Sequence, residues 1–149
     1  MKFYKPTTPG RRGMTKTGQD DLDKKRPEKS LTRGFIPRAG RSRSSGRITT
    51  RHKGGGVKKL FRFIDFRREK TGIPAKVKSI EYDPNRNCFI MLLVYADGEK
   101  RYSLAPVGIK AGDEVGTDKK TLIKIGNRFE LKNIPVGTQV HDVEFLPGQ

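Results

Sequence analysis

Hydrophobic residues recur in short runs between residues 60 and 105 of this 149-residue chain, and turn residues separate the runs. Residues 1–59 show no comparable period, and frequent Pro and Gly would interrupt most helices or strands there. The apolar phase shifts between Val77 and Ile80, which indicates a β-bulge. The pattern predicts strands at LFRFIDFR (60–67), AKVKSIEY (75–82), CFIMLLVY (88–95) and KRYSLA (100–105). CFIMLLVY is apolar at consecutive positions, so we expect both of its faces to be buried.

The turns between these runs favour a small closed β-barrel. Asp83 to Asn87, Asp97-Gly98 and Ala111-Gly112-Asp113 are typical turn sequences. With LIKI (122–125) as a further strand, about five short strands predict an all-β, OB-like barrel. QVHDVEF (139–145) offers one more strand, and because a lone hairpin is marginal in water, the C-terminal residues are expected to begin an unfinished second module.

Positive charge is concentrated in the first half of the chain. Residues 1–70 hold 22 Lys and Arg against 6 Asp and Glu, a net charge of +16, whereas residues 71–149 hold 11 against 10, a net charge of +1. Arg33 to Lys59 contains nine cations and no acid. This segment has too few apolar side chains to fold alone, so we expect a long, unstructured basic extension. It would bind RNA through phosphate contacts that release counterions; a solvated charged linker is the alternative.

Several classes of protein are disfavoured by the composition. The single Cys88 excludes an internal disulfide, and together with two isolated His residues it cannot build a structural zinc site. The longest apolar run is too short to span a membrane, and the N-terminus lacks the apolar core of a signal peptide. These features predict a soluble protein of a reducing compartment, without metal or cofactor.

The candidate chemistry points to contact with RNA rather than to catalysis. Arginine guanidinium groups suit bidentate phosphate contacts and stacking on unpaired bases, and the glycines at 54–56 allow the backbone to approach a phosphate. His52 could stack on a base or remain a surface residue. Phe61, Phe63 and Phe66 could stack on bases, although Phe in a barrel strand is more often a core residue. GGGVKK lacks the spacing of a P-loop, and an enzyme of small anionic substrates would need a pocket with convergent titratable groups.

Seven segments, in order along nearly the whole chain, carry a resemblance to a known family. They are YKPTTPGRRGMT (4–15), RPEKSL (26–31), GRITTRHKGGG (46–56), FIDFRRE (63–69), IPAKVKSIEYDPNRN (73–87), YADGEKRY (95–102) and NIPVGTQVHDVE (133–144). The chain resembles the universal large-subunit ribosomal protein number two in its bacterial or organellar form. The resemblance implies a structural ribosomal protein that binds ribosomal RNA through an OB-like barrel, an SH3-like barrel and extensions.

The resemblance also frames the expected organisation and partners. We expect a basic RNA-binding extension at 1–59, an OB-like barrel at 60–125 and the start of an incomplete SH3-like barrel at 126–149. Expected partners are the RNA of the large subunit, other ribosomal proteins, and a continuation or separate chain that carries the C-terminal half. The expected location is the ribosome, cytoplasmic or organellar. The predicted RNA contacts are Lys5, Arg11, Arg12, Arg33, Arg38, Arg41, Arg43, Arg47, Thr49, Arg51, His52, Lys53, Gly54, Gly55, Gly56, Lys58, Lys59, Arg62, Arg67 and Arg68.

Two departures from the family pattern matter. Val57 stands where the family usually has a His, which removes one ring that could contact RNA. Family members also continue for about as long again, with a basic tail that approaches the peptidyl-transferase region, and any contribution made through that tail is not assigned to this chain. The rival function is a free single-stranded nucleic-acid-binding protein that uses the barrel face; it would keep its affinity without residues 1–59.

Overall fold

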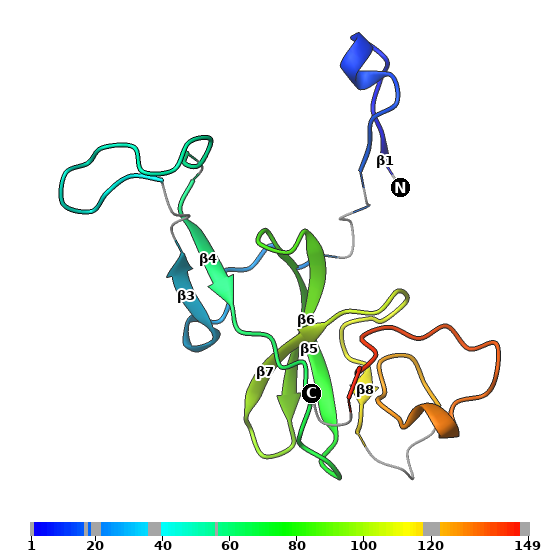
Figure 1. Ribbon diagram of the computed structural model, residues 1–149. Helices are drawn as coiled ribbons and strands as arrows, with labels where there is room; N and C mark the ends of the chain where they lie inside the picture. Colours follow the sequence, from blue (N-terminus) through cyan, green and yellow to red (C-terminus); the bar gives the residue numbers. More distant parts are fainter. Residues whose placement is uncertain are drawn as a thin grey trace.

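The fold is organised around one antiparallel sheet that curls into a half-barrel (Figure 1). The computed structural model describes residues 2–16, 18, 22–35, 40–55, 57–117 and 123–146. The sheet has the strand order β7-β6-β5-β8. Its strands are β5 (Ala75–Asp83), β6 (Cys88–Tyr95), β7 (Lys100–Leu104) and β8 (Glu114–Val115). The strands predicted at 75–82, 88–95 and 100–105 are therefore confirmed.

Strand β6 lies at the centre of the sheet and is buried on both faces, as its apolar run predicts. Met91, Leu93 and Tyr95 pack into one core cluster with residues of β5 and β8. Ile90 and Leu92 pack on the opposite face with Tyr102. The pairing of β5 with β6 shifts register between Val77 and Ser79, which confirms the predicted bulge.

The N-terminal half contains more regular structure than its composition predicts. Strand β1 (Lys2–Phe3) pairs with β2 (Thr15–Lys16) around a 3₁₀ turn at Pro9–Arg11. A second 3₁₀ turn, Lys29–Leu31, leads into β3 (Thr32–Phe35), which pairs antiparallel with β4 (Lys59–Arg62). The prediction of an unstructured extension is wrong for these residues, because their backbone N–H and C=O groups pair with a partner strand although their side chains form no apolar face.

The predicted fifth barrel strand and second module are not confirmed. Of residues 60–67, only the first part forms a strand, and it pairs with β3; Ile64 adds a single parallel bridge to Tyr102 of β7. Residues 123–125 and 139–145 form no strand, and residues 118–122 and 147–149 lie outside the described ranges. The described C-terminal residues contain a 3₁₀ turn at Leu131–Asn133 and a bridge between Thr117 and Arg128. Within the described part of the chain, no helix could cross a membrane.

A buried polar cluster joins the N-terminal segment to the half-barrel. Tyr102 is fully buried; its hydroxyl donates to the Glu81 carboxylate (2.9 Å) and accepts the backbone N–H of Glu28 (2.9 Å). Ser79 also lies within hydrogen-bond distance of Glu81 (3.3 Å). Burial, reinforced by the bond to Glu81, raises the pKa of Tyr102 to about 12. One phenol thus connects residue 28 with the centre of the sheet.

Replacing Tyr102 with Phe should destabilise the protein by about 1–3 kcal/mol, because the Glu81 carboxylate and the Glu28 N–H each lose a buried partner. The matched control is Tyr82→Phe, whose hydroxyl bonds Asn87 near the surface and whose loss should cost less than about 0.5 kcal/mol. Urea unfolding of the three proteins measures both effects. Equal stabilities for Tyr102→Phe and the wild type would contradict this role of the hydroxyl.

The stability advantage of the wild type over Tyr102→Phe should shrink between pH 10 and about 12. In this range the unfolded chain releases the phenol proton while the folded chain retains it, so the folded state loses up to about 1.4 kcal/mol per pH unit. Taking the difference between the two proteins cancels the titration of groups that both share. A difference that stays constant or grows with pH would refute the raised pKa.

Candidate nucleic-acid interface

The acid-free basic stretch is the loop that closes the β3–β4 hairpin. The ladder pairs Thr32 with Arg62 at one end and Phe35 with Lys59 at the other. The chain between the two strands therefore leaves and returns at one end of the hairpin, and Figure 1 shows residues 40–55 projecting away from the half-barrel. We refer to residues 40–59 as the basic loop. Its ends are fixed by backbone pairing, so its charges are held at one side of the molecule.

The basic loop has internal structure of its own. The Gly40 carbonyl accepts the backbone N–H groups of Thr49 (2.8 Å) and Thr50 (3.0 Å) and the Thr49 hydroxyl (3.1 Å). Arg41 bridges to Ile48 in antiparallel fashion. Gly40 has a φ of +63°, and a Cβ there would lie 2.5 Å from the Thr50 carbonyl oxygen, so a glycine is required. The segment predicted to be unstructured thus contains a closed turn.

Most predicted contact residues of the basic loop are exposed. Arg41 donates to the Gly46 carbonyl (3.2 Å), which leaves the rest of its guanidinium fork turned toward solvent. Gly55 has a φ of +75° and open space beside it, so the backbone is accessible there. Arg38 and Gly56 lie outside the described residues. The exposed predicted residues are Arg41, Arg43, Arg47, Thr49, Arg51, His52, Lys53, Gly54, Gly55, Lys58 and Lys59.

A second basic surface lies on the N-terminal arm. Lys5, Arg11 and Arg12 are exposed around the 3₁₀ turn, and the Arg11 guanidinium lies 5.8 Å from the centre of the Tyr4 ring. Figure 1 shows this arm and the basic loop extending from the half-barrel in different directions. Two cationic extensions on one half-barrel would suit a protein that contacts separate RNA segments.

The β5–β6 turn braces the hairpin. Arg86 donates to the fully buried Asp83 (2.8 Å) and to the Arg62 carbonyl (3.3 Å), and its guanidinium lies 4.8 Å from the centre of the Phe61 ring. Asn85 donates to the Leu60 carbonyl (2.7 Å). The sequence predicts only a turn for these residues, because a turn motif does not indicate which strand it will contact.

Two predicted RNA contacts face the protein instead of solvent. Arg62 and Arg68 are each 8% exposed. Arg62 donates to the Leu60 carbonyl (2.7 Å), and Arg68 donates to the Gly126 carbonyl (2.7 Å). Burial lowers the pKa of Arg68. Arg67 is exposed, with Glu69 at 3.5 Å, and Arg33 is exposed on β3.

The aromatic residues of the 60–67 segment are less buried than a barrel strand would make them. Phe63 is 49% exposed and Phe66 is 45% exposed, so the core interpretation is wrong for these two rings. Phe61 is partly buried between its neighbours. The sequence could not reveal this, because the exposure follows from the pairing of β4 with β3 outside the half-barrel.

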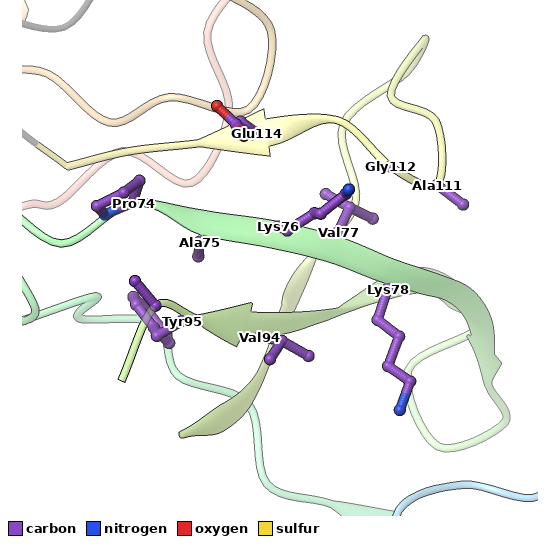
Figure 2. A pocket seen from close by; sticks show the side chains of 11 residues that line it. Pro74, Ala75, Lys76, Val77, Lys78, Val94, Tyr95, Ala111, Gly112 and Glu114 are labelled. Carbon is purple, nitrogen blue, oxygen red and sulfur yellow. The ribbon is translucent and has the colours of Figure 1, made fainter. Parts of the chain in front are cut away.

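A groove of about 690 Å³ runs along β5 (Figure 2). Its charged lining residues are Lys76, Lys78 and Glu114, and Figure 2 shows the side chains of Lys78 and Glu114 pointing apart. The other lining residues are mainly apolar or small. Among the described residues no group of three His, Cys, Asp or Glu side chains could hold a metal ion. The groove lacks the convergent acid, base or nucleophile that a catalytic site needs.

One family model matches the stretch of the chain that holds the hairpin, the basic loop and the half-barrel. The model of the family described as "Ribosomal Proteins L2, RNA binding N-terminal domain" matches residues 28–117, which is more than half of the chain. The match covers the segment from Glu28, which bonds Tyr102, through β8. This chain therefore belongs to the L2 family of large-subunit ribosomal proteins and contains their RNA-binding N-terminal domain.

Proposed function

We propose that the chain is a structural constituent of the large ribosomal subunit that supports subunit assembly and the peptidyl-transferase region, with no catalytic residues of its own. The observation that carries this proposal is the basic loop: an acid-free run of exposed cations closed by the β3–β4 ladder. Such a loop fits between phosphate backbones because it brings positive charge without an apolar body.

Binding would combine electrostatics with a preset loop shape. Each Lys or Arg that meets a phosphate releases a counterion, and arginine forks add directional bonds. The Gly40 turn limits the loop's conformations before binding, which reduces the entropy lost on contact. The brace by Arg86 and Asn85 fixes the direction in which the hairpin points.

The proposed RNA contacts follow exposure. They comprise Lys5, Arg11, Arg12, Arg33 and Arg67 together with the exposed residues of the basic loop named above. Arg38 and Gly56 remain predictions from the sequence. Arg62 and Arg68 are proposed instead to stabilise the fold, because both are buried and donate to backbone carbonyls of the chain itself.

The wider setting is also part of the proposal. Other ribosomal proteins and a continuation or separate chain with the C-terminal half are proposed partners, on a cytoplasmic or organellar ribosome. The division into an extension (1–59), a barrel (60–125) and a second module (126–149) is kept as a proposal, although the β3–β4 ladder crosses its first boundary.

RNA binding should depend steeply on salt. With about 8 to 10 phosphate contacts, the slope of log K against log salt is expected at about −6 to −9. The triple variant Arg47→Ala, Arg51→Ala, Lys53→Ala should reduce the magnitude of this salt slope by about 2 to 3. The control variant Lys110→Ala, Lys124→Ala, Lys132→Ala removes the same charge from exposed positions in the second half and should change the slope by less than one. Fluorescence anisotropy over a salt series measures these slopes, and a wild-type slope near zero would remove the electrostatic basis of the proposal.

Exchanging the basic loop should separate the proposed function from free single-strand binding through the barrel face. Residues 40–57 are replaced by a Gly-Ser linker of equal length, which keeps both strands of the hairpin. We expect at least about a hundredfold loss of RNA affinity at physiological salt, since the exchange removes five of the twelve Lys and Arg residues proposed to contact phosphates. Retained affinity would favour the barrel face. Urea unfolding of the exchanged protein checks that the half-barrel is intact.

A further inference from the structure

The β3–β4 hairpin carries a row of phenylalanine rings beside its cations. Paired residues in an antiparallel ladder share a face, so Arg33 lies opposite Phe61, and Phe35 lies opposite Lys59, on one side of the hairpin. The Phe35 and Phe61 ring centres are 6.3 Å apart, and those of Phe61 and Phe63 are 5.7 Å apart in an edge-to-face arrangement. We call this surface the aromatic face; it consists of Arg33, Phe35, Lys59, Phe61 and Phe63.

The aromatic face is open to solvent. Phe35 is 46% exposed and Phe63 is 49% exposed. Single exposed apolar side chains need no explanation, but here Phe61 contacts both Phe35 and Phe63, so the three rings form a row. Contiguous apolar patches of this kind mark binding surfaces. The central ring is held in place, since the Arg86 guanidinium packs on Phe61 at 4.8 Å and is itself anchored by Asp83. The outer rings are thus presented by a rigid support.

The positive charge around the aromatic face indicates which kind of molecule binds there. No acid occurs between Glu28 and Asp65, so the rings lie in a purely cationic stretch of the chain. A basic protein partner would be repelled there, whereas a nucleotide offers a π-face for the rings and a phosphate for Arg33 or Lys59. Bases in a duplex are already stacked and paired, so only an unpaired base can reach the rings.

We propose that the aromatic face stacks on unpaired bases of RNA, with Phe35 and Phe63 as the platforms and Arg33 and Lys59 holding the adjoining phosphates. This inference rests on the proposed RNA-binding function and adds the class of ligand, a single-stranded segment read by stacking. It also gives the hairpin a function beyond charge neutralisation by the basic loop, and Lys59, the first residue of β4, belongs to both surfaces.

A tryptophan substitution tests the stacking directly in the full chain. The protein contains no Trp, so Phe63→Trp introduces the only indole. A single-stranded RNA oligonucleotide should quench its emission by at least about half, whereas an abasic oligonucleotide of equal length and charge should bind and leave the emission nearly unchanged. Equal quenching by both probes would overturn the proposal, because the bases would then play no part.

Affinity provides the second readout. The double variant Phe35→Ala, Phe63→Ala should bind the single-stranded RNA about tenfold or more weakly and bind the abasic probe as the wild type does, with the same salt slope. The control Phe145→Ala removes a ring that is 95% exposed outside the hairpin and should leave both affinities unchanged.

An unchanged affinity of the double variant for RNA would overturn the proposal and leave the aromatic face for a protein contact. If the wild type binds neither probe, the proposed function fails as well, so the two failures are distinguishable.

Discussion

The antiparallel ladder between β3 and β4 determines how this protein presents its charge. Without it, residues 33–59 would be an unpaired cationic segment between Glu28 and the half-barrel, and their charges would repel one another. The ladder pairs Phe35 with Lys59, closes the segment between them into a loop and anchors that loop at the end of the hairpin. The same four-residue strands orient the aromatic rings, so the electrostatic and stacking surfaces depend on one set of backbone hydrogen bonds.

A short ladder of this kind needs support, since an isolated hairpin is marginal in water. The half-barrel supplies support at two places. Arg86 and Asn85 in the β5–β6 turn contact the backbone and ring of β4. The Tyr102 hydroxyl accepts the backbone N–H of Glu28, just ahead of β3. Lys100 forms a hydrogen-bonded ion pair with the Glu28 carboxylate, which lowers the pKa of Glu28. The half-barrel therefore acts as a rigid support for the extensions that we propose contact RNA.

The sequence predicted the half-barrel better than the interface. Consecutive apolar residues at 88–95 and the phase shift after Val77 were sufficient to predict β6 and the bulge, because burial on both faces leaves a local pattern. Strand β3 has no such pattern: Thr32-Arg33-Gly34-Phe35 becomes a strand only because β4, on the far side of the loop, pairs with it.

The same limit applies to individual side chains of the candidate site. Arg68 has the sequence context of a surface cation, but its guanidinium is buried and donates to the carbonyl of Gly126, 58 positions away. Phe63 has the context of a core residue, but the hairpin leaves the half-barrel and its ring stays exposed. Charge, by contrast, could be predicted, because a run without a single acid remains cationic in any fold.

The most direct test of the account is ultraviolet crosslinking of the chain within purified large ribosomal subunits, with the crosslinked peptides mapped by mass spectrometry. We expect RNA crosslinks on the basic loop and the β3–β4 hairpin and few or none on the buried strands β5 and β6. Crosslinks confined to the half-barrel, or failure of the chain to sediment with the large subunit, would contradict it.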